Sequence, residues 1–242
     1  MISENIKDVH QKINDAAKKA GRNSADITLC AVSKTKPLSD ILECMRCGEN
    51  VFGENYVQEI VAKCEELEQL NQSENGKDSV DVSGISIHMI GHLQTNKVKY
   101  IIDKVDMIHS VDSIKLALEI EKQAVKKNLE MDVLLEVNIA DEESKWGFGA
   151  DEVRAAIEEI KNTCPHVKIR GFMTSAPYTE DPETNRIHFR NLKGLFDELK
   201  KENPLLDTLS MGMTGDYQVA VEEGATIVRV GTGIFGARDY SH

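Results

Sequence analysis

The chain has 242 residues, and its 41 acidic and 29 basic side chains give a formal net charge of −12 at pH 7. This charge repels a phosphate backbone and argues against broad nucleic-acid binding. No segment stays apolar long enough to span a bilayer, and the N-terminus lacks the apolar run of a signal peptide, so we expect a cytoplasmic protein.

The five cysteines do not indicate a disulfide framework, because their number is odd and their spacing is irregular. Cys44 and Cys47 form a CxxC, but no second CxxC or histidine pair follows at zinc-finger spacing. The surrounding segment, ILECMRCG, is typical of the end of an amphipathic helix. We therefore expect free thiols and no metal site.

Short apolar segments alternate with helical patterns along the chain. A helical period covers residues 3–20, and Gly21 follows where a helix would stop. Eight later segments have the composition of strands: ITLCAVS, NVFG, SIHMIG, DMIHS, DVLLEVN, VKIRGFM, DTLSMGM and TIVRVG. Helical patterns separate them at residues 38–47, 55–70, 94–103, 112–127, 151–162, 184–202 and 215–223.

Strict alternation of strands and helices predicts an α/β fold with a parallel sheet, and eight strands match a closed (β/α)8 barrel of the TIM type. An open doubly wound sheet is the alternative, but no GxGxxG or GxxxxGKS follows an early strand. Residues 71–84, NQSENGKDSVDVSG, indicate a polar loop. We expect residues 1–242 to form one domain, a barrel with an extra N-terminal helix.

Lys34 follows the apolar run LCAV, at the strand end where a barrel builds its site. Burial disfavours the ammonium form and makes a lysine nucleophilic toward carbonyls. A solvated lysine just past a strand is the simpler alternative. Lys36 is a rival, but Pro37 favours an extended conformation that carries it away from the barrel wall.

Two glycine-containing turns, in SMGMTGD and VGTG, follow the seventh and eighth strands. Backbone N–H groups at helix N-termini bind phosphate, and barrels often place one between these two loops. Tight turns alone would also explain the glycines. Together with Lys34, the turns are the minimum equipment for pyridoxal phosphate (PLP), although a phosphorylated sugar held as in Schiff-base aldolases would use the same features.

Other polar residues at the strands have two interpretations each. Arg229, in TIVRVG, forms a structural salt bridge or faces the cofactor's pyridine nitrogen, which it would keep unprotonated. His88 is a proton donor or a hydrogen-bonded structural residue. Asn55 contacts the ring or caps the following helix. Turn ends alone would explain a further set, namely His92, Gln94 and Asn96.

The motifs that carry these residues resemble those of the pyridoxal phosphate homeostasis protein (YggS-like) family. They are AVSKTKP, FGENYVQE, HMIGHLQTNK, SKWGF, GFMTSAP, LSMGMTGDYQVAVEEG and VRVGTGIFGAR, in this order. The resemblance runs from about Ile27 to Arg238, and the family is similar to the N-terminal barrel of alanine racemase and other fold-type III enzymes. This chain departs from it at Ile87, where an aromatic residue often stands, and in the longer 71–84 segment.

The resemblance implies a role for each candidate residue. Lys34 would hold PLP as a Schiff base, the internal aldimine, and Arg229 would face the ring nitrogen. Four residues would bind the phosphate: Ser210, Thr214, Gly231 and Thr232. Three match positions lining the ring: Asn55, His88 and Met173.

The resemblance further implies a PLP-binding protein that buffers or delivers the cofactor to apo-PLP enzymes, with no catalytic residue. The alternative is a fold-type III enzyme such as an amino-acid racemase. A two-base racemase needs an acid/base opposite the lysine, which in alanine racemases resembles a tyrosine from a following β domain and the dimer partner. The chain ends just after its eighth β/α unit, so we expect no racemase and a monomer.

Overall fold

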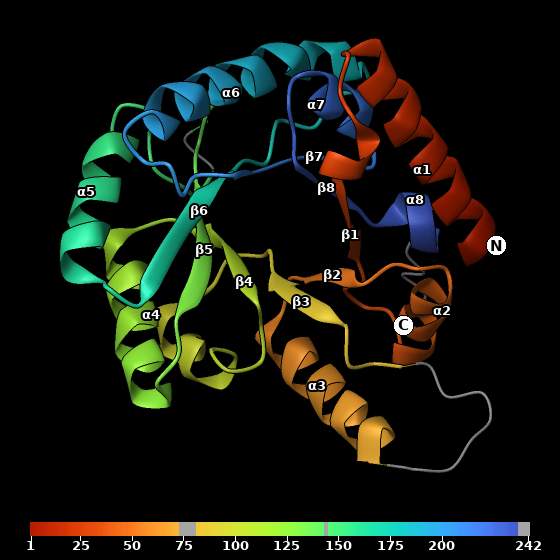
Figure 1. Cartoon of the computed structure of the whole chain (residues 1–242), viewed down its shortest axis with the longest axis horizontal. Coiled ribbons are helices and arrows are strands. Elements are labelled where there is room, and N and C mark those ends of the chain that lie inside the picture. Colours follow the sequence, from red (N-terminus) through yellow and green to blue (C-terminus); the bar gives the residue numbers. More distant parts are fainter. Residues whose placement is uncertain (73–80, 143–144, 237–242) are drawn as a thin grey trace.

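The computed structural model describes residues 1–72, 81–142 and 145–236. Eight parallel strands follow one another around a closed barrel, which β1 and β8 complete by pairing with each other (Figure 1). The strands are β1 (Thr28–Val32), β2 (Val51–Glu54), β3 (Ser86–Met89), β4 (Met107–Val111), β5 (Met131–Glu136), β6 (Val167–Met173), β7 (Thr208–Met213) and β8 (Ile227–Val230). Every strand expected from the sequence is present, which confirms the barrel.

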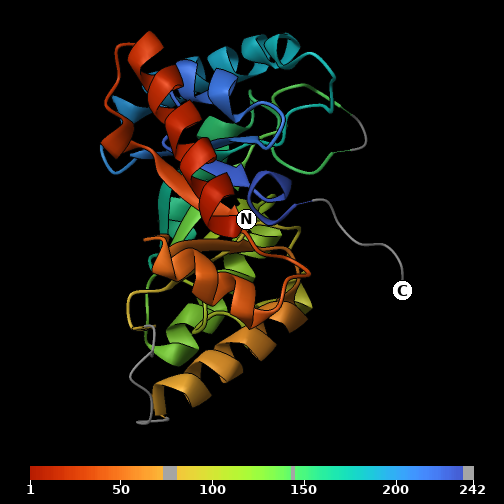
Figure 2. The same ribbon diagram turned by 90° about the vertical axis from the view of Figure 1, so that its right-hand side faces the viewer.

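Helices surround this barrel. They are α1 (Ile2–Lys19), α2 (Leu38–Arg46), α3 (Val57–Gln72), α4 (Ile114–Lys127), α5 (Val153–Thr163), α6 (Arg186–Lys200), α7 (Tyr217–Glu222) and α8 (Thr232–Phe235). Three short 3-10 helices join them: η1 (Ser24–Asp26), η2 (Thr95–Tyr100) and η3 (Pro182–Asn185). The extra helix α1 packs against α7, α8 and α2, along one side of the barrel (Figure 2).

Two segments differ from the sequence prediction. The helical pattern at 94–103 forms the 3-10 helix η2 followed by turns, because only Val98, Ile101 and Ile102 anchor this short connection to the core. The expected loop at 71–84 begins later, since α3 continues to Gln72. Residues 73–80 of that segment lie outside the described residues.

The parallel strands place all their carboxyl ends on one face of the barrel. The loops that follow β1, β6, β7 and β8 therefore meet there. None of the helices in the described ranges combines the length and apolar character that a membrane crossing requires.

Candidate functional site

A cavity of ≈ 760 Å³ opens at the carboxyl end of the barrel. This volume suits a small-molecule cofactor. Six of the nine predicted site residues line it: Lys34, Asn55, Thr214, Arg229, Gly231 and Thr232. The carboxyl ends of β1, β2, β7 and β8 thus bring the predicted lysine, the arginine and both glycine-containing turns to one cavity.

The backbone before Lys34 is held from outside the barrel by a buried ionic cluster. Ser33 Oγ donates a hydrogen bond to Glu54 Oε1 at 2.6 Å, and Lys63 Nζ donates to the same oxygen at 2.6 Å. Lys63 Nζ also donates to the Ser33 carbonyl oxygen at 2.8 Å. Burial raises the pKa of Glu54, and the Lys63 ammonium and the Ser33 hydroxyl oppose that shift.

The backbone after Lys34 is held in an uncommon conformation. Thr35 has a φ of 64°, in the left-handed region that non-glycine residues rarely adopt. Its N–H donates to Glu59 Oε2 at 2.6 Å. Lys36 does not line the cavity, and its Nζ donates to the Phe235 carbonyl oxygen at 3.2 Å. The structure therefore places the earlier of the two lysines at the site.

The two glycine-containing turns meet at one hydroxyl. Thr214 Oγ1 accepts hydrogen bonds from Gly231 N at 3.3 Å and from Gly233 N at 3.4 Å. These N–H groups belong to the turn that opens α8. The turns therefore gather donors of the kind that bind a phosphate.

The tight-turn interpretation also holds for one glycine in this region. Gly212 has a φ of 89°, and an added Cβ would lie 2.9 Å from Tyr217 Cα. Close approach of α7 to β7 therefore requires glycine there.

Arg229 is buried and bonds to neutral groups. Its Nη1 donates to Ser210 Oγ at 2.7 Å and its Nη2 donates to the Thr174 carbonyl oxygen at 2.8 Å. No carboxylate accepts a hydrogen bond from it within the described part of the chain, so the structural salt bridge is not observed. Burial lowers the pKa of Arg229, while Glu136 and other nearby acidic groups oppose the shift.

Asn55 supplies a polar atom without a partner. Its Oδ1 is buried and accepts no hydrogen bond from any residue that the structure describes. It therefore does not cap α3, the alternative considered from the sequence. Leaving a buried acceptor unpaired costs about 1–3 kcal/mol, and a ligand donor in the adjacent cavity would remove that cost.

The remaining three predicted residues do not line the cavity. Ser210 is hydrogen-bonded to Arg229, and His88 lies farther down the barrel, where its Nδ1 is 2.9 Å from His109 Nε2. Met173 is 1% exposed and its Sδ lies 3.9 Å from Ser175 Oγ.

Several residues that line the cavity were not predicted from the sequence, including Lys145, Ser175 and Tyr178. Lys145 Nζ donates to the Ser175 carbonyl oxygen at 2.8 Å, which links the loop after β5 to the loop after β6. Lys145 and Ser175 lie within the motifs SKWGF and GFMTSAP, and Tyr178 directly follows the second motif. The motifs were the available signal, but neither spacing nor composition indicated which side chains reach the cavity.

Glu136, at the end of β5, makes a testable contribution to stability. Burial raises its pKa from 4.5 to about 7, the Asp112 carboxylate adds to the shift, and Arg229 and Lys145 oppose it. Because the pKa of Glu136 is higher in the folded than in the unfolded protein, this side chain contributes its full stabilisation below about pH 4.5. That contribution to the free energy of unfolding is lost as the pH rises through 7. We expect Glu136→Gln to stabilise the protein at about pH 8 by up to about 3 kcal/mol relative to its effect at about pH 4.5.

Urea unfolding of the cofactor-free wild type and Glu136→Gln at both pH values measures this difference. An equal effect of the substitution at the two pH values would contradict the raised pKa.

A neighbouring shallow cavity of ≈ 520 Å³ contains the residues assigned to a turn. His92 stacks on Trp146 with ring centroids 4.1 Å apart, and its Nδ1 lies 3.0 Å from Asp112 Oδ2. Gln94 and Asn96 line the same cavity. His92 therefore connects the turn after β3 to residues that follow β4 and β5.

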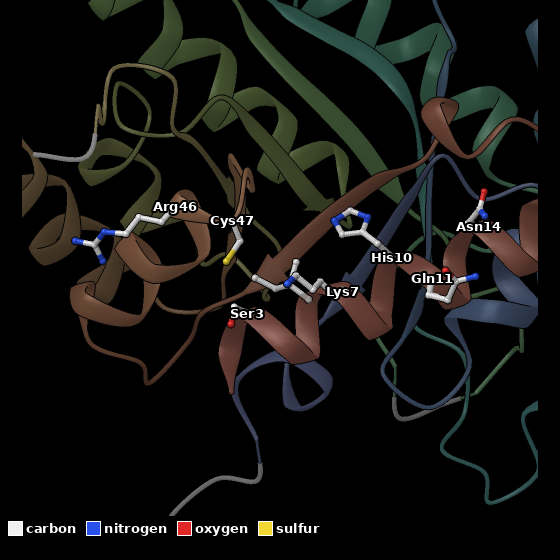
Figure 3. Close-up of a pocket in the computed structure, with 8 residues that line it drawn as sticks. Ser3, Lys7, His10, Gln11, Asn14, Arg46 and Cys47 are labelled. Carbon is white, nitrogen blue, oxygen red and sulfur yellow. The ribbon is translucent and has the colours of Figure 1, made fainter. Parts of the chain in front are cut away.

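A third hollow, between α1 and the end of α2, has a volume of ≈ 640 Å³ (Figure 3). Its polar side chains do not converge, since Arg46 extends away from Lys7 and His10. Cys47 borders it, whereas Cys44 is buried, and burial raises the Cys44 pKa to about 12. This hollow has no arrangement of groups comparable to that around Lys34.

The fold and the cavity define a class of protein: a (β/α)8 barrel with a lysine, a buried arginine and a cluster of N–H donors at its carboxyl end. Residues 5–239 match the family described as alanine racemase, N-terminal domain. The pyridoxal phosphate homeostasis protein of Aquifex aeolicus is 45% identical over 238 residues, 98% of each chain. The chain belongs to this family of pyridoxal phosphate homeostasis proteins, as its motifs indicated.

Solved structures agree with this assignment. A crystal structure described as an unknown protein from Bifidobacterium adolescentis has a TM-score of 0.87 at 35% identity, covering 97% of this chain and 94% of that one. PipY of Synechococcus elongatus, solved with PLP bound, has a TM-score of 0.78 at 31% identity, covering 98% of this chain and 100% of that one.

Proposed function

We propose that this protein binds PLP in the cavity at the carboxyl end of the barrel and serves in PLP homeostasis, as a buffer or a donor of the cofactor. The observation that carries the proposal is the meeting of Lys34, Arg229 and the Thr214 cluster of N–H donors in one cavity. PipY, a relative of similar fold, has been solved with PLP bound.

The residues present fit this cofactor. When bound, PLP supplies an aldehyde that condenses with a lysine amine. Lys34 presents that amine, and Thr214, Gly231 and Thr232 offer hydroxyl and backbone donors for the phosphate. Asn55 Oδ1, buried and unpaired among the described residues, accepts a hydrogen bond from the ligand. Arg229 presents a donor that keeps its proton, so the ring nitrogen stays unprotonated.

Titration of the purified protein with PLP tests this proposal. We expect a visible absorption band that saturates at one equivalent, and borohydride reduction followed by peptide mapping should locate the label on Lys34. A protein that gains no band, or that is labelled only on surface lysines, would contradict the proposal.

Among the described residues that line the cavity, Tyr178 is the one tyrosine, and it bears on the alternative of a racemase. Its side chain is 95% exposed, so nothing in the described chain holds its hydroxyl as a second acid/base. We therefore propose carriage of the cofactor rather than turnover. Racemisation of alanine by the purified protein at ordinary enzymatic rates would contradict this.

We further propose that the protein is a monomer with a single domain, that it is located in the cytoplasm, and that it delivers PLP to apo-PLP enzymes. Transfer can be measured by mixing the loaded protein with a PLP-free apoenzyme and following the activity that the apoenzyme regains.

A further inference from the structure

A network of hydrogen-bonded side chains crosses the barrel interior beneath the cavity. From Arg229 on β8 it passes to Ser210 on β7, where Nη1 and Oγ are 2.7 Å apart. Ser210 Oγ lies 3.1 Å from His109 Nδ1 on β4, and His109 Nε2 lies 2.9 Å from His88 Nδ1 on β3. The network ends at Ser86, the first residue of β3, whose Oγ lies 3.1 Å from His88 Nε2.

Arg229 and the buried Ser210 hydroxyl together set the direction of the hydrogen bonds in this network. A guanidinium can only donate, so the Ser210 hydroxyl accepts from Arg229. The Ser210 hydroxyl is fully buried, and His109 Nδ1 is the one acceptor within reach of its proton among the described residues, so the hydroxyl donates to that nitrogen. His109 must then carry its proton on Nε2 and donate it to His88 Nδ1. His88 is likewise protonated on Nε2 and donates to Ser86 Oγ. The reverse direction would also connect the four pairs, but it would leave the proton of the fully buried Ser210 hydroxyl without an acceptor among the described residues.

Both imidazoles are neutral in this arrangement. Burial lowers the pKa of His88 to about 4, against the opposing charge of Asp106. Burial also lowers the pKa of His109 well below its ordinary value, and His88 and Arg229 add to the shift. The network therefore keeps its proton arrangement throughout the physiological pH range.

Such a polar network is unusual in the interior of a barrel. The interior of such barrels is ordinarily packed with branched aliphatic side chains, which need no partners. Here His109 and Ser210 are fully buried and His88 is 6% exposed. Buried polar groups add to stability only when all their hydrogen bonds are made, so a network of five polar side chains requires more exact geometry here than aliphatic packing would.

We propose that His109 and His88 are positioning residues that act on the cofactor through Ser210 and Arg229. The two rings fix the Ser210 hydroxyl as an acceptor toward Arg229, and this holds the guanidinium at the floor of the cavity, facing the cofactor ring. The inference rests on the proposed function. It assigns to His88 a place beneath the ring contacts rather than among them.

The first test uses the cofactor-free protein. With 15N-labelled histidine, NMR should show His88 and His109 as neutral Nε2–H tautomers, unchanged between about pH 5.5 and 8. Ser210→Ala removes the hydrogen bond that selects the His109 tautomer, so the His109 signals should move toward a mixture of tautomers. An Nδ1–H tautomer or a charged ring at either position in the wild type would overturn the proposal.

The second test uses the loaded protein. His109→Leu should weaken PLP binding at least about tenfold, because it leaves the Ser210 hydroxyl free to turn away from its acceptor role. The pH midpoint of the visible band should shift as well. His109→Asn, which preserves a side-chain acceptor near the Nδ1 position, should restore part of both effects and serves if the leucine variant does not fold.

Ile157→Ala is the matched control, because it creates a cavity at a buried position in α5 and removes no residue of the network. It should lower stability while leaving the tautomers and the pH midpoint unchanged. Equal effects of His109→Leu and Ile157→Ala on PLP binding would overturn the positioning role. A wild type that binds no PLP contradicts the proposed function instead, and the tautomer measurement distinguishes the two failures.

Discussion

Lys34→Ala is expected to abolish the visible band that one equivalent of PLP produces in the wild type. Lys34 lines the cavity, and the backbone on both sides of it is fixed by Glu54, Lys63 and Glu59. The Lys34 amine therefore extends from a rigid backbone, which lowers the conformational entropy lost when PLP binds. Loss of the amine removes the covalent attachment, and only the contacts to the phosphate and ring remain. Absorption spectra at equal protein and PLP concentrations measure the effect.

Lys36→Ala is the matched control for this prediction. It removes an amine two residues away that bonds to the Phe235 carbonyl oxygen and does not line the cavity. Its band should match that of the wild type. If Lys34→Ala keeps the full band while Lys36→Ala loses it, the assignment of the lysine is wrong.

The barrel could be predicted from sequence because each strand is a short apolar run bounded by helical patterns. The pattern is local, and eight repeats of it leave few topologies. The segment at 94–103 was harder, since its buried residues Val98, Ile101 and Ile102 fit one turn of either helix type. Hydrogen bonding in the folded chain, rather than periodicity, decided that η2 is a 3-10 helix.

The cavity was predictable where a residue immediately follows a strand, as Lys34 and Gly231 do. The partners of Arg229 were not predictable, because Ser210 and the Thr174 carbonyl oxygen come from other strands and one of them is a backbone atom. The same holds for the contact between Thr35 and Glu59, which depends on how α3 packs. Such contacts are fixed by closure of the barrel and leave no local pattern.

Gly171→Ala is expected to have the largest effect on folding. Gly171 follows an irregularity in the pairing of β5 with β6, where Val133 pairs with Ile169 and Leu134 pairs with Gly171, so that Arg170 is an extra residue in β6. At Gly171 the φ is 157°, and an added Cβ would lie 1.7 Å from the Thr208 carbonyl oxygen. Backbone on β7 must move to admit the methyl group, and we expect a loss of roughly 4 kcal/mol or more in the free energy of unfolding.

Gly194→Ala is the control for this prediction, since Gly194 is exposed in α6 and an added Cβ would meet nothing within 4 Å. Alanine should stabilise that helix by about 0.5–1 kcal/mol. Urea unfolding of the two variants should therefore give changes of opposite sign, and a Gly171→Ala protein within about 1 kcal/mol of the wild type would contradict the bulge geometry. The same displacement of β7 would move Ser210, two residues beyond Thr208, so any folded Gly171→Ala protein should also bind PLP more weakly. Gly171 thus connects the stability of the barrel to the position of Arg229 at the floor of the cavity.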